Sequence, residues 1–191
     1  TTSGFLYARR AAATPELARM RESNAALNQF LAGHQVDYDL GDEYMLEWFG
    51  QVNGRQFAVG EAEYDVLVLP PDLVNLRHQT LPLLERWLAA GGTVLSLSPA
   101  PAYVDGRLSE APAALKARYR TQWVDVDAPQ MLVTELGRRL APRIQFAEAV
   151  PASVGFSERY LANGDRVLFL INSGLATVKT MATVEAGSLE R

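Results

Sequence analysis

The sequence contains no cysteine, only two histidines and very little lysine, so its positive charge is almost all arginine. Without cysteine, disulfides, thiolate metal sites and cysteine nucleophiles are all excluded. The net charge of −4, with no basic stripe interleaved with aromatic residues, argues against nucleic-acid binding. No apolar run reaches about 18 residues, the length that a membrane-spanning helix needs. We therefore expect neither a nucleic-acid nor a membrane partner.

The remaining composition is that of an ordinary globular protein. The chain has 191 residues, of which 48% are apolar and 21% charged, enough for one domain and a small appendage. It opens on Thr1-Thr2-Ser3, with neither an initiator methionine nor a signal peptide, and closes directly after a strand-like segment. We interpret it as a domain of a longer polypeptide. Its compartment stays open, with a periplasmic or secreted parent as one candidate.

The most informative pattern is a strand, a helix and a second strand. Residues 66–69 form a short, continuous apolar run, typical of a parallel strand covered on both faces, and Pro70-Pro71 ends it. A helix with Leu81, Leu84 and Leu88 on one stripe follows, and Gly91-Gly92 stops it before a second buried run at 94–97. Such crossovers are right-handed. The sequence predicts an α/β fold with an open, mostly parallel sheet flanked by helices, an arrangement that resembles class I glutamine amidotransferase-like and flavodoxin-like folds.

Other segments complete this expectation. Before the crossover we expect a strand at 4–8 and then a helix from Pro15 to about Ala32, which buries Leu17, Met20, Ala25, Leu27 and Leu31. A strand at 36–40 and a short helix from its cap Asp42 to Trp48 should follow. A hairpin that turns at Asn53-Gly54 completes this part of the chain. After a loop at 99–112 we expect a helix at 113–119, a strand at 122–126 and a helix at 129–140.

The character of the chain changes near residue 145. A hairpin turning at Asn163-Gly164 and a third strand at 178–184 are typical of the start of a β-sandwich or of a terminal meander. We therefore divide the chain into an α/β domain at 1–145 and a β-rich segment at 146–191.

Ser98 occupies the position at which amidotransferase-like folds carry a nucleophile. A working nucleophile elbow uses the backbone N–H of the next residue as an oxyanion donor, but that residue is Pro99, which has no N–H. Both histidines, His34 and His78, precede Ser98, whereas such folds usually draw the base from a later strand end. We expect no catalytic residue, and a small hydrolase that uses Ser98 remains the alternative.

Candidate ligand contacts are few. Asp37 and Asp39 would share a face of their strand and could bind a cation or a sugar hydroxyl, although solvated carboxylates are the simpler interpretation. Trp48 is the best candidate for an exposed platform on which a sugar ring stacks, since Trp87 lies near an apolar stripe. We therefore name Trp48 and Asp39 as candidate carbohydrate contacts.

No cofactor or metal is expected. Neither histidine has a second ligand at metal-binding spacing. The first expected strand is followed by Arg9-Arg10 and three alanines rather than by a glycine-rich turn that could hold phosphate. A nucleotide- or flavin-binding module is a further alternative.

Several segments together resemble a known family. They are Asp37-Tyr38-Asp39, Gln51–Arg55, Tyr64–Pro71 and Ala89–Val94, with Arg159, Asn163–Asp165 and Phe169–Asn172 towards the end. The chain resembles the amidotransferase-like domain of large bacterial glycoside hydrolases, especially the α-L-rhamnosidases of family 106, and over a shorter part it is similar to the trimerisation domain of family 42 β-galactosidases. The resemblance covers roughly residues 4–184, and its motifs are mostly fold-determining.

The resemblance implies a non-catalytic accessory domain in an enzyme of carbohydrate degradation. In that family the domain follows a catalytic barrel and leads into β-sandwich domains, so these domains are the implied partners, with a homo-oligomer and a carbohydrate as further candidates. The implied parent hydrolyses glycosidic bonds with two carboxylates on its barrel. Because those acids belong to the barrel, the resemblance assigns no catalytic residue to this chain.

Overall fold

The computed structural model describes residues 15–184, so the strand expected at 4–8 lies outside the described residues. The chain has an α/β fold that mixes helices and strands and contains a parallel sheet. The described residues form two compact units, the first of residues 15–25 and 40–132 and the second of residues 26–39 and 133–184. These units are not the domains expected at 1–145 and 146–191, which stay a prediction.

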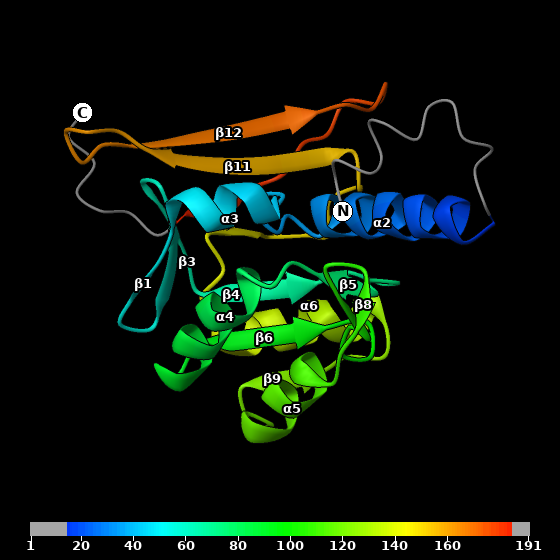
Figure 1. The fold of residues 1–191 in the computed structure, drawn as a ribbon. Coiled ribbons are helices and arrows are strands. Elements are labelled where there is room, and N and C mark those ends of the chain that lie inside the picture. Colours follow the sequence, from blue (N-terminus) through cyan, green and yellow to red (C-terminus); the bar gives the residue numbers. More distant parts are fainter. Residues whose placement is uncertain (1–14, 185–191) are drawn as a thin grey trace. The chain divides into compact units, whose positions relative to one another are not determined.

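The first unit is built on a parallel sheet of three strands (Figure 1). These are β4 (Val66–Leu69), β6 (Thr93–Ser96) and β9 (Trp123–Asp125), in the order β4-β6-β9. The register pairs Val66 with Thr93 and Val94 with Trp123. The predicted adjacency of the two apolar runs is confirmed. In this sheet β6 is the central strand, with Val94 and Leu95 fully buried, whereas β4 lies at the end of the order.

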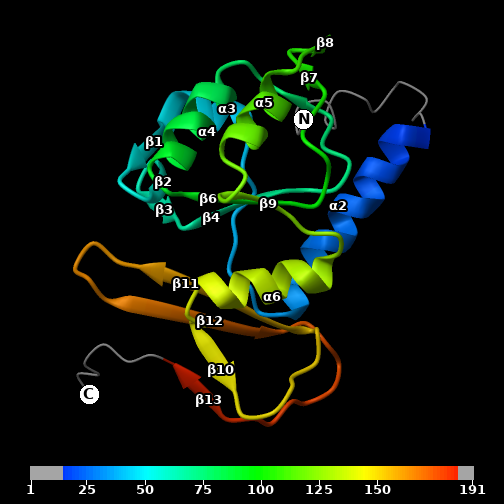
Figure 2. The ribbon, with the colours of Figure 1, turned by 90° about the horizontal axis from the view of Figure 1, so that it is seen from below.

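Helices cover this sheet. Figure 2 shows α3 (Glu43–Phe49), α4 (Thr80–Ala89) and α5 (Ala111–Arg118) on the same side of it. The crossover helix α4 buries Leu84 and Leu88 of the predicted stripe together with Trp87, whereas Leu81 is only partly buried. Gly91 has φ +89°, and a Cβ on Gly92 would lie 2.2 Å from the Trp87 ring. The glycine pair therefore both stops the helix and makes room for the tryptophan.

Two further sheets of short strands complete the first unit. The strands β1 (Gly50–Asn53), β2 (Gln56–Val59) and β3 (Ala62–Tyr64) form one sheet, and Gly54 with φ +60° turns the predicted hairpin. The strands β5 (Asn75–Leu76), β7 (Tyr103–Val104) and β8 (Arg107–Leu108) form another. The interpretation of 99–112 as a plain loop is therefore wrong, because the Asp105-Gly106 turn folds β7 onto β8.

The helices α2 (Pro15–Gly33) and α6 (Pro129–Arg139) contribute residues to both units. Within α2, Leu27 and Leu31 are buried as predicted, but Leu17 and Met20 are only partly buried and Ala25 is exposed. The strand expected at 36–40 is not formed. In its place the side-chain amide of Gln35 donates to the carbonyl of Val154 at 2.9 Å. Side-chain contacts, rather than a strand ladder, hold the residues that follow.

Two antiparallel pairs of strands make up the β part of the second unit (Figures 1 and 2). The longer pair is β11 (Val154–Tyr160) with β12 (Arg166–Asn172), and the shorter is β10 (Ile144–Phe146) with β13 (Ala182–Val184). The predicted third strand at 178–184 is thus limited to its end and pairs with β10. The turn at Asn163-Gly164 spans three residues, with only Gly164 at positive φ (+87°), so it is longer than the expected tight turn.

Candidate functional site

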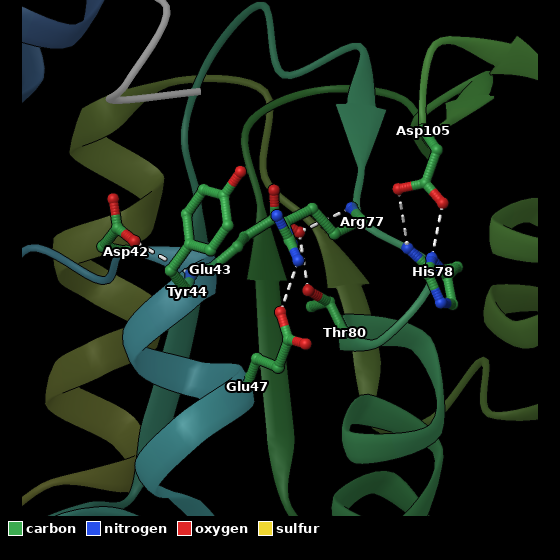
Figure 3. A network of polar contacts seen from close by, with 8 residues as sticks. All are labelled: Asp42, Glu43, Tyr44, Glu47, Arg77, His78, Thr80 and Asp105. Carbon is green, nitrogen blue, oxygen red and sulfur yellow. Dashed lines mark hydrogen bonds and ion pairs between the residues drawn. The ribbon is translucent and has the colours of Figure 1, made fainter.

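Polar side chains gather in the first unit where α3 and α4 begin (Figure 3). The cluster joins the start of α3 to the segment before α4 and to the β7–β8 turn. We call it the α3–α4 network; its members are Asp42, Glu43, Tyr44, Glu47, Arg77, His78, Thr80 and Asp105. Asp42 caps α3 as predicted, since its Oδ1 accepts the backbone N–H of Tyr44 at 2.8 Å.

Glu43 connects the two helices. Its Oε1 accepts the backbone N–H of Arg77 at 2.8 Å and the hydroxyl of Thr80 at 2.6 Å. Its Oε2 is buried and has no hydrogen-bond partner among the described residues. Because Thr80 is itself buried, this carboxylate fixes α3 against the start of α4.

Arg77 lies between an aromatic ring and a carboxylate (Figure 3). Its guanidinium carbon lies 3.7 Å from the centroid of the Tyr44 ring, and its Nη2 forms an ion pair with Glu47. Burial alone would lower the pKa of Arg77, but the Glu47 carboxylate and Tyr44 outweigh it and raise the pKa. Arg77 therefore stays a cation and holds two successive turns of α3.

His78 and Asp105 form the outer edge of the network. The backbone N–H of His78 donates to Oδ1 of Asp105 at 3.2 Å, and Nδ1 of the ring lies 2.5 Å from Oδ2. Burial would raise the pKa of Asp105, but the hydrogen bonds from His78 and the charge of Arg77 nearby outweigh it, so the pKa is lowered. A histidine–aspartate pair can act as a general base towards a hydroxyl or a water; the Thr80 hydroxyl in the network is already donated to Glu43.

A shallow groove of about 350 Å³ lies between α3 and α4. Leu46, Pro82 and Leu83 contribute apolar surface, and His78 and Arg86 contribute polar groups. The groove is open to solvent and has a mixed lining, so it carries no assignment of a ligand.

One side of α3 presents large apolar side chains to solvent. No residue of this helix is buried, and Leu46 is the one that packs against the core. We define the α3 apolar face as Tyr44, Met45, Trp48 and Phe49. Trp48 is 66% exposed, as predicted for a platform residue, and its ring centroid lies 6.1 Å from that of Tyr44 and 6.4 Å from that of Phe49.

Asp39, the other candidate carbohydrate contact, belongs to the second unit. Its carboxylate lies 3.8 Å from Nη2 of Arg159, whose Nη1 lies 3.9 Å from Asp37. Asp37 also accepts the backbone N–H of Glu158 at 3.3 Å. The two aspartates thus share one arginine, although they do not share the face of a strand. Because Asp39 and Trp48 lie in different units, the structure does not define a common site for them.

Ser98 lies in a bend two residues beyond the end of β6, and the next helix, α5, begins only at Ala111. Its hydroxyl donates to the carbonyl of Pro70 at 3.1 Å. The φ angle of Ser98 is not positive, so Ser98 does not adopt the strained turn of a nucleophile elbow. The hydroxyl therefore ties the ends of β4 and β6 together.

The described residues include no group of three or more histidine and acidic side chains that could hold a metal ion. Over the same range, no helix has the length and apolar character needed to cross a membrane.

The α3–α4 network was not predicted from the sequence. Glu43 is more than thirty positions from both Arg77 and Thr80 along the chain, and each of the three alone has the pattern of an ordinary surface residue. The only local signal was the cap at Asp42. The exposed side of α3 could have been found from the closeness of three aromatic residues in a helix of seven.

Comparison of the chain with protein-family models, with curated protein sequences and with solved structures finds no match.

Proposed function

We propose that this chain is a non-catalytic accessory part of a multidomain glycoside hydrolase, and that its first unit has an amidotransferase-like fold. In this proposal the α3 apolar face packs against the catalytic barrel of the parent protein. The observation that carries the proposal is the exposure of Tyr44, Met45, Trp48 and Phe49 on one side of a helix that the α3–α4 network holds in place.

The composition of the face supports a protein partner. Aromatic residues and methionine are enriched at the centres of protein interfaces. Tyrosine, tryptophan and phenylalanine bury about 150–250 Å² each when fully covered. With these three aromatic side chains and Met45 roughly half exposed, the face offers about 400 Å², within the range of the largest apolar patches on monomers, which are often functional. A rigid helix presents these anchors with little ordering cost on binding.

The absence of a working elbow at Ser98 supports the non-catalytic part of the proposal. Pro99 supplies no N–H to an oxyanion, and the Ser98 hydroxyl is already donated to a backbone carbonyl. Purified chain should show only background turnover of aryl glycosides and aryl esters. Turnover that disappears in Ser98→Ala would instead support the alternative of a small hydrolase.

Trp48 offers a direct test of the docking face. Trp87 and Trp123 are buried, whereas Trp48 is exposed, so acrylamide quenching of the chain reports mainly on Trp48. In the full-length gene product we expect an adjacent barrel domain, and quenching of Trp48 should fall when that domain is present. Trp48→Phe in both proteins gives the background signal. Equal quenching of Trp48 with and without the barrel, or a reading frame that encodes no barrel, would contradict the proposal.

A carbohydrate contact at Trp48 is the second candidate, favoured by its exposed ring beside Tyr44. It predicts that neutral oligosaccharides protect Trp48 from quenching in the isolated chain, without any other domain. Asp39, which is paired with Arg159, would contribute only through a contact made in its own unit.

A further inference from the structure

The strand β12 in the second unit carries an unbroken apolar run at its centre. Val167 to Ile171 are all apolar, with Arg166 before them and Asn172 after them. Phe169 and Ile171 point to one face of the hairpin and Leu170 to the other, because side chains alternate along a strand. They are 51%, 62% and 53% exposed, respectively. A run of this kind is typical of a strand covered on both faces and paired at both edges.

The outer edge of β12 has no partner among the described residues, since β12 pairs only with β11. The backbone N–H of Glu158, which lies opposite Leu168, is donated to Asp37. Glu158 and Leu168 are therefore a non-hydrogen-bonded pair. By the alternation of an antiparallel ladder, the N–H and C=O groups of Leu168 and Leu170 point away from β11. They form an edge that can accept another strand.

The pattern of this edge is self-complementary. When β12 is placed antiparallel to a second copy of itself with Phe169 at the centre, Leu168 faces Leu170 of the second copy and Val167 faces Ile171. At the ends Arg166 faces Asn172, so no like charges are opposed. Apolar cross-strand pairs stabilise sheets, and two-fold symmetric contacts are the commonest in homo-oligomers. We propose that β12 pairs with β12 of a second copy of this chain and joins two hairpins into a four-stranded sheet.

Such an assembly closes at two copies. The other edge of the hairpin, that of β11, is already in use, because Asp37 accepts the N–H of Glu158 and Pro151 accepts the N–H of Val154 at 2.9 Å. A further strand cannot add there without displacing these contacts. The exposed edge therefore leads to a dimer rather than to an open fibre. This inference goes beyond the proposed function and does not depend on it.

Disulfide trapping tests the pairing directly, since the chain has no cysteine of its own. In the proposed register the two copies of Phe169 face each other as a non-hydrogen-bonded pair, with Cα atoms about 4.5 Å apart, within reach of a disulfide. Val167 is the matched control on the same strand and face. Its two copies would lie about 13 Å apart, because each is displaced four residues along the strand from its counterpart.

Under mild oxidation, Phe169→Cys should give a covalent dimer and Val167→Cys should stay monomeric. Sedimentation of the unmodified chain should show a reversible monomer–dimer equilibrium with no larger species. Leu170→Pro removes an outward N–H while leaving the hairpin bonds in place, so it should raise the dimer dissociation constant about tenfold or more and leave the circular dichroism unchanged. A chain that is monomeric up to millimolar concentration, growth beyond the dimer, or equal cross-linking of the two cysteine variants would overturn the proposal.

Discussion

The Glu43 carboxylate gives the sharpest test of how α3 is held in the first unit. Its Oε1 accepts the backbone N–H of Arg77 and the hydroxyl of Thr80, and Thr80 is only 5% exposed. In Glu43→Ala both donors lose their acceptor. A buried donor without a partner costs about 1–3 kcal/mol. Because water can reach part of the space left by the side chain, we expect a total loss of about 2–4 kcal/mol in the free energy of unfolding.

Glu43→Gln is the matched control for this prediction. The glutamine keeps an oxygen acceptor at the position of Oε1, and its NH₂ group takes the position of Oε2, which has no hydrogen-bond partner among the described residues. The loss for this variant should stay below about 1 kcal/mol. Urea unfolding followed by circular dichroism gives both values from the midpoint and the slope. Equal losses in the two variants, or an unchanged midpoint in Glu43→Ala, would refute the reasoning that these hydrogen bonds fix α3.

Three further predictions follow from single positions. Gly54→Val and Gly164→Val should each lower the melting temperature, because both glycines have positive φ. Left-handed backbone geometry costs a β-branched residue about 1–2 kcal/mol. An unchanged melting temperature in both variants would show that the turns tolerate side chains. Asp105→Asn should destabilise the chain near pH 7. The pKa of Asp105 is lowered by folding, so its contribution is present above its ordinary value of 3.8 and disappears as the pH falls through the folded value; unfolding curves for the two proteins should converge at low pH, and a constant difference would contradict this. Leu95→Ala should lower the free energy of unfolding by about 2–5 kcal/mol, and Leu108→Ala should lower it very little, since Leu95 is fully buried and Leu108 is 80% exposed. Equal urea midpoints for the two variants would contradict the central position of β6 in the sheet.

The sequence predicted the parts of the fold whose signals are local. The apolar runs of β4 and β6, the stripe of α4 and the stop at Gly91-Gly92 lie within about thirty residues, and each agrees with its neighbours. Where propensity, periodicity and turn residues all indicate the same element, tertiary contacts seldom change the secondary structure of that segment. The cap at Asp42 and the hairpin turn at Gly54 were predictable for the same reason.

The errors lie where a distant contact decides the local structure. Residues 36–40 alternate like a strand, but Asp37 accepts a bond from Glu158 and pairs with Arg159, more than a hundred positions away. These side-chain contacts hold the segment without a ladder. The strand β13 likewise pairs with β10 rather than with the nearer hairpin. Neither partner could be identified from patterns within one segment.

The α3–α4 network shows the same limit for function. Its central contact joins Glu43 to Arg77 and Thr80, and no single residue of the three is unusual for a protein surface. Trp48 could be named from the sequence because Trp87 lies near the apolar stripe of α4, which left Trp48 as the better candidate for an exposed ring. What could not be predicted is that Tyr44 also contacts Arg77, so that one ring belongs both to the network and to the α3 apolar face.

The two exposed apolar surfaces differ in what they can bind. Side chains of a helix form the α3 apolar face, whose backbone bonds are satisfied within the helix, so it suits a partner that offers a complementary apolar surface. The edge of β12 adds unpaired backbone groups, so it requires a strand as its partner. Because the surfaces belong to separate units, loss of one contact need not affect the other. If Trp48 becomes shielded in the full-length protein while Phe169→Cys still cross-links, the docking face and the dimer are independent functions of one chain.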